Sequence, residues 1–192
     1  MKEKNVSGMR VAILATDDFE ESELIEPKKA LDAAGAVTAV VSPASKKIQA
    51  MRHDEKTIKV DADMLLSEAN ADDFDAVVLP GGALNADALR VVPAAQEFVR
   101  QMDRAGKPVA VICHGPWLLV SASLVRGRHL TSYHTIQDDL RNAGAQWDDV
   151  EVIRDRNWVS SRQPSDLPAF NREMLSLFGE HHAESGKIRE AA

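Results

Sequence analysis

The sequence predicts a single α/β domain in which helices cover both faces of a doubly wound, mostly parallel sheet. Short apolar runs alternate along the chain with longer amphipathic segments, which is the pattern of repeated strand–helix units. The apolar runs are continuous rather than alternating with polar residues, as expected for strands buried on both faces. No linker or internal repeat divides the chain, and 192 residues suit one domain with a substantial core.

Predicted strands and helices occupy most of the chain. We expect strands at residues 9–15, 36–42, 74–79, 108–112, 130–133, 150–154 and 158–161. We expect helices at 19–34, 65–69, 93–105, from 116 onwards, at 136–143 and at 168–178. Pro27 is expected to bend or restart the first helix. Residues 44–60 are predicted to form a small antiparallel hairpin beside the main sheet. Residues 1–8 are predicted to be a disordered lead-in, 9–179 the domain and 180–192 a polar tail.

Composition excludes several classes of protein. A formal net charge of -7 argues against nonspecific binding to nucleic acid or to anionic membranes. No apolar run approaches the ~20 residues that cross a bilayer, and the polar start lacks a signal-peptide core. A single cysteine cannot form an internal disulfide, so we expect a cytoplasmic protein. No Cys/His pair has the usual ligand spacing, and we expect neither a metal nor a cofactor.

The main catalytic candidate is Cys113, the only cysteine of the chain. It follows a charge-free apolar run, and Pro116 suits the first turn of a helix. A reactive side chain on such a strand-to-helix turn forms a nucleophile elbow. Helix N–H groups at this place would lower the pKa of the thiol from its usual value near ~8.5. The alternative is that Cys113 is a small buried apolar residue of the core.

Two further side chains, those of His114 and Glu20, are candidates for the same site. His114 could act as a general base or hold the thiolate, although neighbouring side chains usually point in different directions. Glu20 could share a proton with the thiol, or it could simply favour a helix N-terminus together with Glu21 and Glu23. Because ligands bind beyond the carboxyl ends of parallel strands, the loop at 16–20, the Gly81-Gly82 turn and the elbow should be neighbours.

Backbone N–H groups could bind an oxyanion in this region. Gly81, Gly82 and His114 are the candidates, since glycines let the backbone approach a ligand closely. A turn without chemistry is the alternative for the two glycines. Asn85 and Asp87 follow the turn, and capping of a helix is the more conservative interpretation of both.

Together these motifs resemble the PfpI-like family, the intracellular protease I type within the class I glutamine-amidotransferase-like superfamily. The resemblance rests on Asp-Phe-Glu-Glu-Ser-Glu-Leu at 18–24, Val-Leu-Pro-Gly-Gly at 78–82, Ile-Cys-His-Gly-Pro at 112–116, Gly-Arg at 127–128 with Thr-Ser-Tyr at 131–133, and Asn-Trp-Val-Ser-Ser-Arg at 157–162. These stretches run in family order from about residue 9 to 178.

The resemblance implies a flavodoxin-like three-layer sandwich with Cys113 as the nucleophile on a strained elbow. It implies that Glu20 hydrogen-bonds the sulfur and that His114 is the neighbouring histidine. In the members described as peptidases, an acid from the adjacent subunit completes a Cys-His-acid triad. Asp87 is nearest to that position here, although the match needs a one-residue gap. The resemblance also implies a homodimer that in some members builds up into hexamers.

Three functions follow from these residues. The first is a stress-response enzyme of the glutathione-independent glyoxalase or deglycase type, in which Cys113 adds to the aldehyde of methylglyoxal and Glu20 moves a proton on the way to lactate. The second is an intracellular cysteine peptidase completed by oligomerisation. The third is a redox-sensing, chaperone-like stress protein in which Cys113 is oxidised. We favour the first, with a small carbonyl compound as substrate and a peptide as the alternative.

Overall fold

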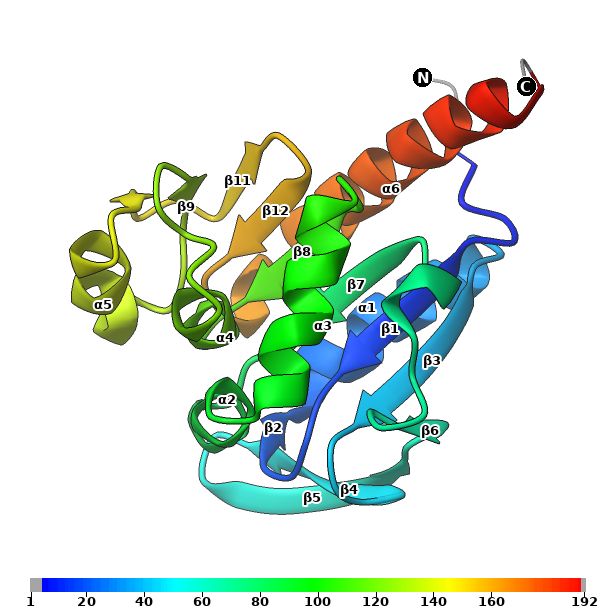
Figure 1. Cartoon of the computed structure of the whole chain (residues 1–192). Helices are drawn as coiled ribbons and strands as arrows, with labels where there is room; N and C mark the ends of the chain where they lie inside the picture. Colours follow the sequence, from blue (N-terminus) through cyan, green and yellow to red (C-terminus); the bar gives the residue numbers. More distant parts are fainter. Residues whose placement is uncertain (1–4, 191–192) are drawn as a thin grey trace.

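The protein is a three-layer α/β sandwich in the computed structural model, which describes residues 5–190 and, for 187–190, only their place in a helix (Figure 1). The strands are β1 Arg10–Leu14, β2 Phe19–Glu20, β3 Val37–Ser42, β4 Lys47–Arg52, β5 Glu55–Asp61, β6 Met64–Leu65, β7 Ala76–Leu79, β8 Val109–Ile112, β9 His129–Leu130, β10 Gln146–Trp147, β11 Val152–Asp155 and β12 Trp158–Ser161. The α-helices are α1 Glu21–Ala33, α2 Ala83–Arg90, α3 Pro93–Arg104, α4 Pro116–Ser121, α5 Gln137–Asn142 and α6 Leu167–Glu190.

The main sheet has the order β11-β12-β8-β7-β1-β3-β6 within residues 5–190. Every neighbouring pair in it is parallel except β11 and β12. The chain therefore winds outward from β1 in both directions, which confirms the predicted doubly wound sheet. This topology brings the carboxyl ends of β1, β7 and β8 side by side, and such an edge is where ligands bind in open α/β sheets.

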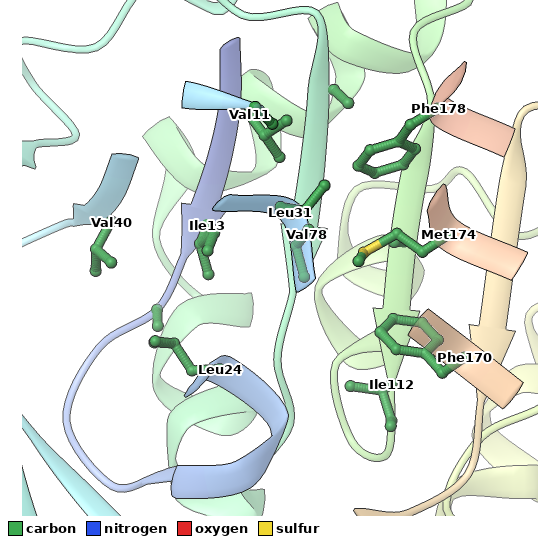
Figure 2. Close-up of a cluster of buried hydrophobic side chains, with 14 of the residues drawn as sticks. Val11, Ile13, Leu24, Leu31, Val40, Val78, Ile112, Phe170, Met174 and Phe178 are labelled. Carbon is green, nitrogen blue, oxygen red and sulfur yellow. The ribbon is translucent and has the colours of Figure 1, made fainter. Parts of the chain in front are cut away.

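Two apolar layers cover the sheet because successive strand residues point to opposite faces. Val11 and Ile13 of β1 pack against α1 and α6, where the cluster includes Phe170, Met174 and Phe178 (Figure 2). Ala12 and Leu14 of the same strand belong to the second layer, which α3 and α4 complete. Burial on both faces explains the uninterrupted apolar runs in the sequence.

The first helix begins two residues later than predicted. Phe19 and Glu20 form β2, which pairs with β4 of the hairpin, and α1 then runs without interruption through Pro27. The predicted hairpin at 44–60 is confirmed as the antiparallel pair β4–β5. Because β4 pairs with β2, the hairpin lies next to the loop at 16–20, at the same edge of the main sheet (Figure 1).

Several boundary predictions were wrong. Residues 65–69 are not a helix, because Met64 and Leu65 extend the sheet by pairing with β3. Residues 83–90 form α2, which was not predicted. The expected polar tail from 180 continues α6, and Arg154 of β11 binds Glu180 at 2.6 Å.

The described part of the predicted lead-in is packed against the domain. Val6 is fully buried in the core, and the N–H of Gly8 donates to the carbonyl of Gly35 at 2.9 Å. Residues 1–4 lie outside the described part of the chain. Among the helices of residues 5–190, none is long and apolar enough to cross a membrane.

Candidate active site

Cys113 is held on a strained turn between β8 and α4. Its φ of +62° lies in the left-handed region, which costs a residue other than glycine about 1–3 kcal/mol when the surrounding structure enforces it. Backbone hydrogen bonds fix the turn on both sides: the N–H of Cys113 donates to Ser161 at 3.0 Å, and its carbonyl accepts from Tyr133 at 2.9 Å. A Cβ on Gly115 would lie 2.7 Å from the Leu79 carbonyl oxygen, so only glycine fits there. The predicted nucleophile elbow is present.

The loop at 16–20, the Gly81-Gly82 turn and the elbow lie together, as the sequence predicted. They border a cavity of about 500 Å³. The loops touch closely: a Cβ on Gly82 would lie 2.6 Å from the carbonyl oxygen of Asp18, and a Cβ on Gly81 would lie 2.5 Å from the Cβ of Cys113. The residues that line the cavity are Glu20, Glu23, His53, Gly82, Ala83, Cys113, His114, Tyr133, Gln163, Pro164 and Ser165.

The carboxyl group against the thiol belongs to Glu23. This side chain is fully buried, and its Oε2 accepts the N–H of Gly81 at 2.8 Å. In the described part of the chain, Oε1 has no nitrogen or oxygen donor, and the carboxyl interacts with the thiol of Cys113. Burial, followed by the charge of Glu20, raises the pKa of Glu23 from 4.5 to about 8. Glu23 can therefore both accept and donate a proton near neutral pH.

The thiol does not have the lowered pKa that a helix N-terminus suggested. Burial and the neighbouring charge of Glu23 raise the pKa of Cys113 well above its ordinary value. Hydrogen bonds from the backbone N–H groups of Gly82 and His114 oppose this change without cancelling it. The two acids thus compete for protons, and they are best regarded as one coupled pair.

Glu20 lies at the same cavity but does not take the place predicted for it. Its Oε2 accepts the N–H of His53 at 3.0 Å, at the tip of the β4–β5 hairpin. The acid whose carboxyl acts on the thiol of Cys113 is Glu23, not the expected Glu20. The physical reason is the start of α1: Glu20 precedes the helix in β2, whereas Glu23 lies on the buried helix face with Leu24, Pro27 and Leu31.

The side chain of His114 lies close to the sulfur of Cys113, although side chains of adjacent residues usually point in different directions. The left-handed backbone at Cys113 turns the two side chains together, and Nδ1 lies 3.2 Å from Sγ. The other ring nitrogen, Nε2, lies 3.3 Å from Oγ1 of Thr135. Burial, followed by the charge of His134, lowers the pKa of His114, so its imidazole is neutral at pH 7.

The turn glycines have different tasks. The N–H of Gly81 is occupied by Glu23, so it is not free to bind an oxyanion, whereas those of Gly82 and His114 point at the sulfur.

Asn85 does not cap a helix. It is buried in α2, where it accepts from the N–H of Thr16 at 2.8 Å and donates to the carbonyl oxygens of Pro80 and Gly81.

Asp87 lies on the exposed side of α2. Within this chain the second nitrogen of His114 is taken by Thr135, so Asp87 stays a candidate only for the site of a neighbouring subunit. No group of three or more His, Cys, Asp or Glu side chains in residues 5–190 is arranged to hold a metal ion.

Sequence reasoning missed seven residues of the cavity lining, among them the polar residues Glu23, His53, Gln163 and Ser165. A signal for Glu23 existed, since it is one residue before Leu24 and four before Pro27, on the apolar face of the helix. For the other three, nothing in the local sequence indicates a site. An ion-pair network holds the loop of Gln163 and Ser165, with Arg162 bound to Asp166 and Asp149, each at 2.8 Å.

Fold and site together define a doubly wound α/β protein that holds a cysteine on a strained strand-to-helix turn beside a buried carboxyl. Residues 9–177 match the model of the DJ-1/PfpI family, and the chain belongs to that family. The chain is 46% identical over 169 residues to "Deglycase PYRAB04690" of Pyrococcus abyssi, which covers 88% of this chain and 99% of the relative. It is 43% identical to "Putative cysteine protease YraA" of Bacillus subtilis, with 88% and 97% covered.

A solved structure supports the fold independently. The two-domain protein of Anabaena variabilis with DJ-1/ThiJ/PfpI-like and ferritin-like domains superposes with a TM-score of 0.84 and 37% identity. The match covers 89% of this chain and 48% of the two-domain protein. The flavodoxin-like sandwich is therefore shared with this family.

Proposed function

We propose that the protein is a cysteine-dependent enzyme that acts on small reactive carbonyls and converts methylglyoxal to lactate without glutathione, as part of a stress response. The observation that carries the proposal is the contact between Glu23 and Cys113. A carboxyl whose pKa is raised to about 8 lies beside a thiol on an elbow, at a cavity of about 500 Å³. This is a nucleophile beside a group that can move protons. The deglycase name of the Pyrococcus relative agrees with carbonyl chemistry.

The first step is addition of the thiol to the aldehyde. The carboxylate form of Glu23 takes the thiol proton while the sulfur forms a bond to the aldehyde carbon. The carbonyl π-electrons move to oxygen, which the N–H groups of Gly82 and His114 are placed to stabilise. Return of the proton to that oxygen gives a neutral hemithioacetal. Glu23 then regains its carboxylate form.

The second step moves a proton between the two substrate carbons. Glu23 removes the proton from the carbon bound to sulfur, the electrons of that C–H bond form a carbon–carbon double bond, and the former ketone oxygen carries the negative charge of an enediolate. Glu23 then returns the proton to the neighbouring carbon, and the hydroxyl proton of the sulfur-bearing carbon passes to the former ketone oxygen while a C=O bond forms at the sulfur-bearing carbon. The product is a lactoyl thioester on Cys113. Water then cleaves the thioester and releases lactate and the free thiol, so no redox partner is needed. In this proposal the proton-shuttle role belongs to Glu23 rather than to Glu20.

The experiment compares the wild type with Cys113→Ala, Glu23→Gln and Glu26→Gln. Glu26 is a half-exposed residue of the same helix that pairs with Lys29, so Glu26→Gln is the matched control. We expect lactate formation from methylglyoxal in the wild type and in Glu26→Gln, and its loss in the other two. Absence of lactate from the wild type, with stoichiometric oxidation of Cys113 by peroxide, would support the redox-sensor function instead.

Peptidase activity is the second candidate, and the 3.2 Å approach of His114 Nδ1 to Sγ favours it. The name of the Bacillus relative agrees with it. A triad would require an acid at Nε2 in place of Thr135, which Asp87 of a neighbouring subunit could supply in a homodimer or hexamer. The test measures peptide cleavage by the wild type and by variants at Cys113 and Asp87, and light scattering gives the assembly state of each. Cleavage that depends on both residues and on assembly would favour the peptidase over the carbonyl enzyme.

A further inference from the structure

The charges around the cavity are of one sign. Glu20 borders the cavity with its side chain fixed, because Oε2 accepts the N–H of His53 at 3.0 Å. Glu23, the other acid of the lining, has its pKa raised to about 8 and is largely protonated at pH 7. Of the residues that the structure describes, no lysine or arginine lines the cavity. Glu20 is therefore the uncompensated charge that an incoming molecule meets.

The cationic side chain next to His53 in the sequence does not neutralise this charge. Arg52 precedes His53 on the hairpin, but it is 67% exposed and lies 3.6 Å from the carboxylate of Glu21. The left-handed conformation of His53, with a φ of +57°, directs its N–H rather than a charged group at Glu20. The hairpin thus fixes the Glu20 carboxylate without pairing it to an opposite charge.

We propose that Glu20 is a charge-selecting residue that admits uncharged carbonyl compounds to Cys113 and rejects carboxylates of the same size. The inference deepens the proposed function, because it restricts the substrate class to uncharged aldehydes and ketones and excludes 2-oxo acids. A carboxylate that enters the cavity loses water and gains a like-charged neighbour, and both effects oppose its binding. Selection by size cannot achieve this, because a ketone and its 2-oxo acid analogue occupy nearly the same volume.

The direct test measures alkylation of Cys113 by iodoacetamide, which is neutral, and iodoacetate, which is its anionic near-isostere. The chain has one cysteine, so the mass shift identifies the site without ambiguity. At pH 7, where Glu23 is largely protonated, we expect iodoacetate to be disfavoured relative to iodoacetamide at least about tenfold more strongly than with a free thiol. The ratio of the two rates cancels any change in the ionisation of the thiol.

The diagnostic variant is Glu20→Gln, whose amide oxygen still accepts from the N–H of His53. We expect this variant to lose most of the preference for iodoacetamide over iodoacetate. The control is Glu21→Gln, at the next residue, which does not line the cavity and should keep the preference. A wild-type ratio equal to that of a free thiol, or an unchanged ratio in Glu20→Gln, would overturn the proposal.

A second measurement covers the case in which Cys113 resists both reagents. Pyruvate carries a carboxylate oxygen where 2,3-butanedione carries a methyl group, so the two compounds have nearly the same size and differ in charge. Each is tested as an inhibitor of methylglyoxal turnover. We expect Glu20→Gln to strengthen inhibition by pyruvate roughly tenfold and to leave that by 2,3-butanedione unchanged. Equal inhibition by pyruvate in both proteins contradicts charge selection. Charge-selective alkylation without lactate formation would instead refute the proposed function alone.

Discussion

The carboxyl of Glu23 lies between the N–H of Gly81 and the thiol of Cys113, so one buried acid joins three segments of the chain. Its Oε2 is bound to Gly81 at 2.8 Å, and its pKa is raised to about 8 chiefly by burial. A Cβ on Gly81 would lie 2.4 Å from Oε2 and 3.1 Å from Sγ, which shows how closely the three residues fit. Helix α1, the turn after β7 and the elbow are thereby fixed relative to one another.

The pH dependence of turnover should follow Glu23. If its carboxylate is the base, kcat/KM for methylglyoxal rises about tenfold per pH unit below pH 8 and levels off above it, because the active fraction follows a pKa of about 8. We expect Glu23→Gln to lower kcat by about 10²–10⁴-fold with a smaller change in KM. A pH-rate profile with an inflection near 4.5 would contradict the assignment.

Stability should also depend on Glu23, with a definite sign. The folded-state pKa of about 8 lies above the ordinary value of 4.5, so between these values the folded chain binds a proton that the unfolded chain has released. The free energy of unfolding of the wild type therefore falls as pH rises from about 5 to 8. Glu23→Gln lacks this contribution, and its Tm relative to wild type should increase over the same interval by several degrees.

Differential scanning fluorimetry at pH 5, 6, 7 and 8 measures this difference. Comparison of the two proteins at each pH removes the contribution of all other titrating groups, and pH 8 is low enough to limit the contribution of the Cys113 thiol. A Tm difference that is constant across the four pH values would show that Glu23 has an ordinary pKa.

Gly81→Ala should abolish activity. The added methyl group would lie 2.5 Å from the Cβ of Cys113, so the turn or the elbow must move, and misplacement of a reacting group by about 1 Å can cost 10²-fold in rate. The matched control is Gly186→Ala in α6, where a Cβ meets no atom within 4 Å. We expect the control to keep full activity. Wild-type turnover in Gly81→Ala would mean that the tight contact is dispensable.

Asn85→Asp should destabilise the protein although the shape is conserved. The amide of Asn85 donates to the carbonyl oxygens of Pro80 and Gly81 at 3.2 and 2.9 Å, and a carboxylate cannot replace either bond. The Gly81 carbonyl keeps the N–H of Glu20 at 3.4 Å, so the variant loses two buried hydrogen bonds, about 0.5–1.5 kcal/mol each, and adds the cost of burying a carboxylate, about 1–3 kcal/mol. We expect a loss of roughly 2–5 kcal/mol in urea unfolding, with Asp87→Asn on the exposed side of α2 as the neutral control. A change below ~0.5 kcal/mol would contradict this role.

Some features of the fold could be predicted because their causes are local. The strand at Val109–Ile112 is apolar throughout, and Pro116 suits a helix start, so the elbow at Cys113 followed from the residues in order. The approach of three loops followed from the general rule for parallel sheets. Other boundaries were missed where tertiary contacts decide them: α6 continues past residue 179 while Arg154 holds Glu180 at 2.6 Å.

The family, the doubly wound sheet and the position of Cys113 on the elbow could be predicted from the sequence, because apolar periodicity and turn residues act over short distances. The sequence did not determine which acidic side chain lies beside the thiol of Cys113. Glu20, Glu21 and Glu23 share one chemistry, and only the position at which α1 begins directs Glu23 to the sulfur and leaves Glu20 to His53. Tertiary structure also set the pKa of each group, since burial depends on residues that are distant in the chain.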